Sequence, residues 1–282
     1  PLGSPNPEFS YPNIHETPYG FNEIFLADRL SPPSAAHLMG TDDLGRDLLS
    51  RCINGARISM IVSLSVTIMA AVGSLALGIT SGYMGGKVDL FIQRINDAVQ
   101  VIPTLLVILT IMAIVGPGLL QVIFVLGGHA ALTSRTERSY VMAIKENVYF
   151  EAAKAIGAST SRIMLRHVMP NIFPLVIVKY SLSMGRVIIQ EAMLSFLGFG
   201  IPPPFPSWGG MLSGTGRRYM LEAPWMLFWP GVCLFLVIYG INVFGDGLRD
   251  LLDPRLRGGL GRYGGMTRKK IEKLVGKKDT EK

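Results

Sequence analysis

The sequence predicts an all-α membrane protein with five spanning helices. Its mean hydropathy is +0.38, and 49% of its residues are hydrophobic while only 17% are charged; in a soluble domain about a quarter of positions are charged. A helix crosses the hydrocarbon core with ~20 predominantly apolar residues. Five stretches approach this pattern, over residues 58–80, 99–115, 119–132, 172–198 and 225–244.

The chain opens with an acidic segment, residues 1–53, which lies ahead of the first apolar stretch. Residues 1–9, PLGSPNPEF, are compatible with a protease-site cloning scar, and we expect a first membrane helix to precede Pro1 in the natural protein. Near the end of this segment Asp47 and Arg51 are spaced i,i+4. This spacing predicts an ion pair on a helix surface.

The first apolar stretch and the turn after it are rich in glycine. Small residues at helix interfaces allow backbones to approach closely, so we expect tight helix packing followed by a turn. A phosphate-binding loop is not expected, because Gly86 and Lys87 lack the glycine and the hydroxyl that the ATP motif places around them. The glycines are Gly73, Gly78, Gly82, Gly85 and Gly86.

The stretch 119–132 is the weakest of the five, since Gly127, Gly128 and His129 interrupt it. We expect it to be a span, and the alternative is a buried or re-entrant segment. Lysine and arginine collect in loops 84–97 and 133–170 and in the tail 248–282. Because short cytoplasmic loops carry such an excess, residues 1–53 are predicted to lie outside and the tail inside, with the transmembrane domain 54–247 between them.

The net charge of +7 is therefore expected to face anionic lipid on the inner side, and nucleic-acid binding is not expected.

Residues 151–170, EAAKAIGASTSRIMLRHVMP, form a polar, basic island between two apolar runs. The pattern predicts a helix from Glu151 to Ile156, a break at Gly157, and a second short helix over 161–168 that Ser159 caps and Pro170 stops.

The island resembles the EAA loop of binding-protein-dependent ABC importer permeases. Glu151, Ala152, Ala153, Gly157 and Pro170 match the pattern, whereas His167 and Met169 replace its usual Ile and Leu. The peptide-importer branch commonly carries a histidine before the closing proline.

The resemblance covers nearly the whole chain. The chain is similar to the second permease of dipeptide and oligopeptide importers, the DppC/OppC-like family. It departs from that family in lacking the first helix and in reading HAALTSRTERSY where a tryptophan is usual near position 129. The matching segments are GTDDLGRDLLSR (40–51), LSFLGFG (194–200), PSWG (206–209), APW (223–225) and GDGLRDLLDPR (245–255).

This resemblance implies a type I ABC importer (MetI-like) transmembrane domain whose loop 147–170 docks a short helix in a cleft of a separate ATPase. It implies a homologous permease as heterodimer partner, two ATPase subunits that hold ATP and Mg, and an extracellular or periplasmic substrate-binding protein. No catalytic residue, cofactor or metal site is expected in this chain. The residues implied in ATPase coupling are Glu151, Ala152, Ala153, Gly157, Ser159, Arg162, Arg166 and Pro170; for the two arginines the alternative is a contact with lipid phosphate.

One face of the stretch 172–198 is polar. Lys179, Ser183, Arg186 and Gln190 follow spacings of four, three and four residues, which places them within ~60° on a helix. A cation near the middle of the hydrocarbon core costs ~2.5–3.5 kcal/mol against lipid. We expect the stripe to line a path for cargo; the alternative is that Arg186 pairs with an acid on a neighbouring helix or on the partner permease.

Other residues favour structural roles. Trp208, Trp225 and Trp229 are predicted to form an aromatic belt at the outer edge of the last span, with stacking on cargo as the alternative. The four histidines are too scattered for a metal site.

The transport cargo remains open between peptides and, as alternatives, nickel, glutathione or oligosaccharide. An intramembrane enzyme is not expected, because neither H-E-x-x-H nor G-x-S-x-G occurs. A channel or an ion-coupled carrier is the remaining class, and flux without ATP would favour it.

Overall fold

The computed structural model describes residues 17–252 and, within that range, is helical with a single isolated bridge between Thr41 and Asp47. Its helices, in chain order, are η1 (Leu26–Asp28), α1 (Leu48–Met84), α2 (Gly86–Val101), α3 (Thr104–Val115), α4 (Leu119–Ala131), α5 (Arg135–Lys145), α6 (Val148–Ala155), α7 (Thr160–Arg162), the π-helical η2 (Ile163–Val168), α8 (Met169–Phe196), α9 (Trp208–Leu212), α10 (Gly214–Arg218) and α11 (Trp225–Leu252).

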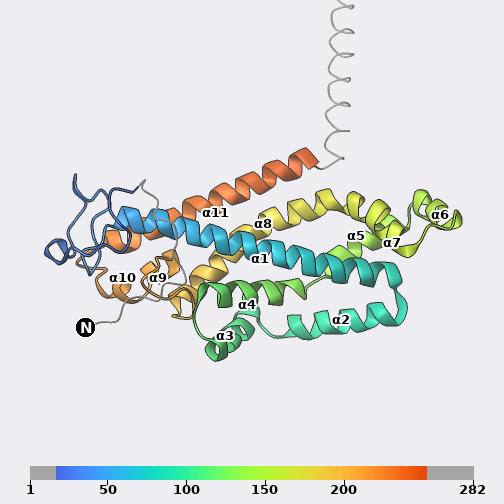
Figure 1. Ribbon diagram of the computed structural model, residues 1–282, viewed down its shortest axis with the longest axis horizontal. Helices are drawn as coiled ribbons and strands as arrows, with labels where there is room; N and C mark the ends of the chain where they lie inside the picture. Colours follow the sequence, from blue (N-terminus) through green and yellow to red (C-terminus); the bar gives the residue numbers. More distant parts are fainter. Residues whose placement is uncertain (1–16, 253–282) are drawn as a thin grey trace, which may run out of the picture.

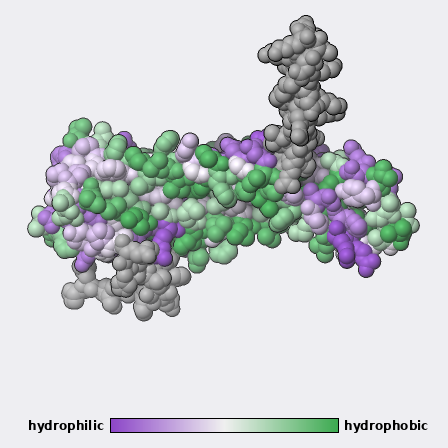
Figure 2. Space-filling view, turned by 90° about the horizontal axis from the view of Figure 1, so that it is seen from above, coloured by the Kyte–Doolittle hydropathy of each residue, from purple (hydrophilic) through white to green (hydrophobic). Residues whose placement is uncertain are grey.

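Three long helices run along the long axis of the molecule (Figure 1) and are apolar enough to cross a membrane: α1, α8 with the turns before it, and α11. They confirm three of the expected spans. The 37 residues of α1 extend over ~55 Å, well beyond a ~30 Å hydrocarbon core. Figure 2 agrees with this arrangement, because hydrophobic residues dominate the middle of the long axis and hydrophilic residues gather toward its ends.

The stretch 99–115, expected as one span, is broken in the structure. The chain forms two helices, α2 and α3, which meet at 85°. Pro103 lacks a backbone N–H and disfavours helical geometry in the residue before it, and Ile102 is accordingly extended, with φ −88° and ψ 133°. Much of what the sequence placed in loop 84–97 is therefore the helix α2, which packs beside α1.

The predicted stretch 119–132 becomes α4, whose bounds agree with it to within one residue. Its 13 residues reach only ~20 Å, and α5 follows after a short break. Both helices pack closely on α1. A Cβ added at Gly78 would lie 2.4 Å from Glu137 Cβ, and one at Gly73 would lie 2.5 Å from Ala131 Cβ. The expected close packing of these glycines is thus confirmed.

Two hydrophobic clusters hold the long helices together. One surrounds the first half of α1, around Val62 and Val66, and includes residues of α3, α4 and α8. The other surrounds its second half and includes Val141 of α5, Phe150 of α6 and Ile172 of α8. The second cluster ties the loop 147–170 to the spans.

The expected surface pair between Asp47 and Arg51 does not form. Asp47 instead caps α1, accepting from Ser50 N at 2.8 Å, and its other oxygen lies 3.0 Å from His37 Nδ1. Arg51 lies 3.5 Å from Asp42. Both side chains are buried beneath residues 17–47, which fold over the end of α1.

The predicted aromatic belt is wrong for Trp208. This side chain is buried against Gly55 and donates to the carbonyl of Cys52 at 3.1 Å. Trp225 donates likewise to Thr41 O, at 3.1 Å. The indole rings therefore join α9 to the first turns of α1 and α11 to the N-terminal segment. Cys52 and Cys233 are free thiols.

Candidate functional site

The island identified in the sequence lies at one end of the molecule, opposite the segment 17–47 (Figure 1). The expected helix is confirmed as α6, and Gly157 interrupts it with a φ of +77°. That backbone geometry favours glycine, and no atom lies within 4 Å of the position of an added Cβ. Ser159 stands at the N-terminus of α7, but its side chain makes no capping hydrogen bond.

The expected stop at Pro170 is wrong, because α7, η2 and α8 continue one into the next. Pro170 lies in the first turn of α8, where the missing N–H is tolerated. The wider turns of η2 just ahead of it shift the hydrogen-bonding register, so the ring does not end the helix. The segment 160–196 is therefore continuous from α7 into α8, and α6 precedes it across the break at Gly157.

The inner face of α6 is anchored in the protein. Phe150 and Ala153 are buried in the second hydrophobic cluster, together with Ile163 of η2. The ring of Phe150 also meets that of Tyr83, near the end of α1, edge to face with 6.0 Å between centroids. The short helix is therefore held rigidly against α1 and the start of α8.

The outer face of α6 is apolar and uncovered by the described residues. Val148 is 84% exposed and Ile156 is 85% exposed, and Ala152 and Ala155 between them are exposed as well. On a helix these four fall within an arc of ~100°, opposite the buried residues. Sequence reasoning read the island as polar and missed this face, although apolar residues spaced by four and by eight are its signal.

The island also carries exposed charged residues on α6, α7 and η2. Glu151, Arg162 and Arg166 are all exposed, and the structure gives the two arginines no ion pair within residues 17–252. The end of the molecule thus presents apolar and cationic side chains together.

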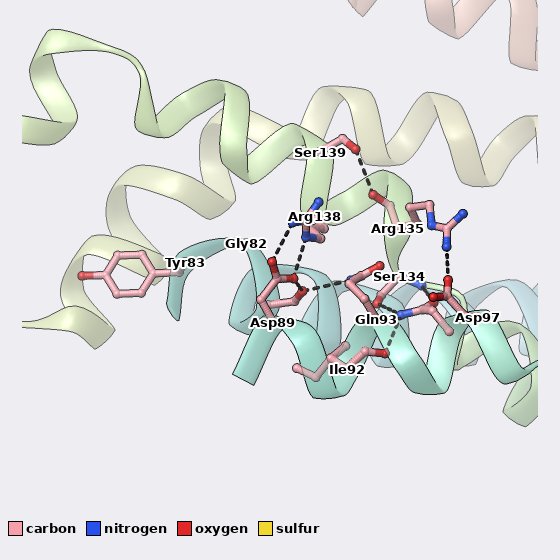
Figure 3. Close-up of polar contacts among 12 residues, drawn as sticks. Gly82, Tyr83, Asp89, Ile92, Gln93, Asp97, Ser134, Arg135, Arg138 and Ser139 are labelled. Carbon is pink, nitrogen blue, oxygen red and sulfur yellow. Dashed lines mark hydrogen bonds and ion pairs between the residues drawn. The ribbon is translucent and has the colours of Figure 1, made fainter. Parts of the chain in front are cut away.

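Ion pairs fix the scaffold behind α6. Arg138 of α5 bonds both carboxylate oxygens of Asp89 on α2, each at 2.6 Å, and Arg135 pairs with Asp97 (Figure 3). The Asp89 carboxylate raises the pKa of Arg138 above its ordinary value. Lys145 donates to the carbonyls of Gly82 and Tyr83 at 3.2 and 3.1 Å. α5 is thereby joined to the ends of α1 and α2.

The polar stripe of α8 is divided by the structure. Lys179 Nζ lies 2.5 Å from Glu137 Oε1, with side-chain exposures of 25% and 0%. The hydroxyl of Tyr180 donates to the same oxygen at 2.8 Å and also bonds Ser74 of α1. Lys179 is therefore held in an ion pair that joins α8 to α5 and α1.

The other members of the stripe face outward. Arg186 is exposed, while Ser183 and Gln190 are half-buried; Ser183 donates to Tyr180 O at 2.9 Å. Within residues 17–252 the guanidinium of Arg186 has no hydrogen bond or ion pair. The described part of this chain thus supplies no acid for it.

Comparison with known proteins agrees with this architecture. The model of a family described as "Binding-protein-dependent transport system inner membrane component" matches residues 74–258. The dipeptide transport system permease protein DppC of Alkalihalophilus pseudofirmus is 38% identical over 242 residues, which cover 86% of this chain and 79% of the relative.

Two further relatives are similar in extent. The oligopeptide transport system permease protein OppC of Bacillus subtilis is 36% identical, covering 85% of this chain and 78% of the relative. The glutathione transport system permease protein GsiD of Pectobacterium atrosepticum is also 36% identical, covering 85% and 80%. A chain in an inward-facing structure of the MetNI methionine ABC transporter superposes with a TM-score of 0.56 at 17% identity, covering 73% of this chain and 96% of that chain, which confirms the expected fold.

Proposed function

We propose that this chain, which belongs to the family of binding-protein-dependent transport system inner membrane components, is a permease subunit of an ATP-driven peptide importer whose α6 docks on an ATPase. In this function it is not itself an enzyme. It pairs with a homologous permease, two ATPase subunits drive the cycle with ATP and Mg, and an extracytoplasmic binding protein delivers the cargo.

The observation that carries the docking proposal is the pair of opposite faces on α6. Phe150 and Ala153 bind it to the rest of the chain, while Val148 and Ile156 present an apolar surface with nothing over it in the described structure. An apolar helix face of this kind suits a hydrophobic groove on a partner protein. Glu151, Arg162 and Arg166 are exposed on the same segment and are proposed to supply charge pairs with the ATPase.

Peptides are the proposed cargo because two of the relatives carry dipeptide and oligopeptide transport in their names. The glutathione permease keeps a second cargo open, and glutathione is itself a small peptide-like anion. Identification by mass spectrometry of the molecule bound to the cognate binding protein separates these cargoes.

The stripe on α8 is proposed to face the path between the two permeases. Ser183, Arg186 and Gln190 face away from the interior of this chain, and a cation at this depth requires either water or an acidic partner. Lys179 contributes to the wall of the path through its pair with Glu137 and is not a free ligand for cargo.

The docking proposal predicts that Ile156→Asp uncouples transport from ATP hydrolysis. The side chain is 85% exposed, so the change should leave the permease folded while placing a charge in the apolar contact, at a cost of 2 kcal/mol or more, roughly 30-fold in affinity. The assembled transporter should lose cargo-stimulated ATPase activity and uptake. The measurement is ATP hydrolysis and uptake by proteoliposomes containing the purified complex.

The matched control is Ile156→Val, which keeps the face apolar and should retain both activities. Normal stimulation and uptake in Ile156→Asp, with the complex intact, would contradict docking through this face.

A further inference from the structure

An arginine cluster lies at the start of α11, at the end of the molecule opposite the island. Arg29 and Arg218 each place a guanidinium over the ring of Tyr219, with Cζ 5.6 and 5.7 Å from its centroid. Arg29 Nη2 also donates to the Tyr219 hydroxyl at 2.8 Å. Arg217 is adjacent to them in the chain, and all three arginines are exposed.

The charge of this cluster is left uncompensated by ion pairs in the described chain. Within residues 17–252 no carboxylate lies within 4.0 Å of these three guanidinium groups. Two acids are close in sequence, Asp28 and Glu222, and Asp28 is directed toward His37 Nε2, 4.0 Å away. One aromatic ring holding two cations gains from each by attraction to the ring face. The cations nevertheless repel one another, and a bound anion relieves this repulsion.

An apolar groove begins where the cluster ends. It encloses about 630 Å³ and is lined by Met220, Pro224, Leu227, Phe228, Gly231, Val232 and Phe235. From Leu227 to Phe235 it follows α11 for ~12 Å along the direction of the span. Only 6% of the apolar part of α11 is buried within this chain, so the groove is exposed to the surroundings of the helix.

We infer that the arginine cluster and the groove form a binding site for an anionic phospholipid, with the phosphate at Arg217 and Arg218 and an acyl chain along α11. Guanidinium groups match phosphate oxygens in geometry and charge. The order is that of a phospholipid in a bilayer, with the charged group at the interface and hydrocarbon below it. Leu221, 89% exposed beside the cluster, is suited to insert at the same interface.

The continuity of the two features favours a lipid over a protein partner. Acidic side chains of a soluble binding protein would meet the arginines, but they would not occupy a groove that descends along a membrane span. A neighbouring permease helix would fill the groove without supplying an anion at its upper end. Only a molecule with a charged head and an apolar tail uses both.

The test is lipid retention by the purified transporter complex, reconstituted in nanodiscs of equal phosphatidylglycerol and phosphatidylcholine and analysed by native mass spectrometry. The wild type should retain phosphatidylglycerol preferentially. Each arginine near an anionic headgroup contributes about fivefold, so Arg217→Gln with Arg218→Gln should reduce the preference by about 30-fold.

Two glycines of α11 provide a matched test of the groove. An added Cβ meets no atom within 4 Å at either Gly231 or Gly240, so a side chain can begin at both positions without a clash at its Cβ. Gly231→Leu fills the groove and should lower retention of the bound phospholipid several-fold. Gly240→Leu, outside the groove on the same helix, should have no effect.

Equal retention of the two lipids by the wild type would overturn the proposal, and so would unchanged retention in both the double arginine and the Gly231→Leu variants. If the double arginine variant kept its lipid but bound the extracytoplasmic binding protein more weakly, the cluster would belong to a protein contact. These readouts do not depend on transport, so they stand apart from the docking of α6.

Discussion

At the residue scale, the carboxylate of Glu137 is fully buried beside the hydrophobic cluster that anchors α6. It receives Lys179 and the Tyr180 hydroxyl on one oxygen, and Gly78 of α1 lies against its Cβ. Its other oxygen is buried without a partner in the described chain. The pair therefore joins three helices, α1, α5 and α8, next to the cluster that anchors α6.

This arrangement predicts unequal costs for removing either partner. Lys179→Met leaves a fully buried carboxylate unpaired and should destabilise the permease by ~3–5 kcal/mol. Glu137→Gln leaves a cation that is 25% exposed and should cost less. The double variant should be more stable than Lys179→Met alone, because no buried charge remains. Thermal unfolding in detergent measures all three; a double variant less stable than Lys179→Met would disprove the pairing.

At the element scale, α8 combines two roles in one helix. Its first turns are continuous with η2 and the island, while its outer half carries Arg186 with no polar partner in the described chain. The helix is continuous over residues 160–196. We therefore expect a displacement of its first turns, over 160–168, to change the position of the stripe.

The exposed guanidinium of Arg186 predicts a change in cargo preference without a loss of assembly. Arg186→Gln should lower uptake of acidic peptides relative to neutral ones, because it removes a cation from the path. Arg186→Lys keeps the charge and should retain the preference. Uptake of the two peptides by proteoliposomes, together with complex yield, is the measurement. Poor yield with unchanged preference would assign Arg186 to a structural pair with an acid on the partner permease.

At the scale of the whole molecule, the fold separates two hydrophilic ends by an apolar middle (Figure 2). The segment 17–47 covers one end of α1, and α6 projects at the other (Figure 1). The excess of lysine and arginine in 84–97 and 133–170 predicts that the α6 end faces the cytoplasm.

That orientation predicts one-sided labelling. Ser34→Cys and Ser161→Cys are both at exposed positions, at opposite ends of the molecule. In a Cys52→Ala, Cys233→Ala background, an impermeant thiol reagent added to intact cells should label position 34 and not position 161. Labelling of position 161 alone would reverse the topology and remove the cytoplasmic ATPase as a partner for α6.

The helical class, the long spans, the position of the island and the break at Gly157 can all be predicted from sequence patterns. These features depend on local properties: hydropathy over ~20 residues, helical period and the conformational freedom of glycine. The bend at Pro103 is also predictable from sequence, because the restriction that proline places on the residue before it is local.

Which polar groups contact one another depends on how distant segments of the chain pack together. Arg51 turns to Asp42, Lys179 to Glu137 across 42 residues, and Trp208 to Cys52 across 156. Periodicity places a side chain on a face of its helix, but the face opposite it is set by packing of distant segments. Packing also distinguishes the two apolar faces of α6, which cannot be told apart from the sequence. In the structure Phe150 is buried and Ile156 is exposed.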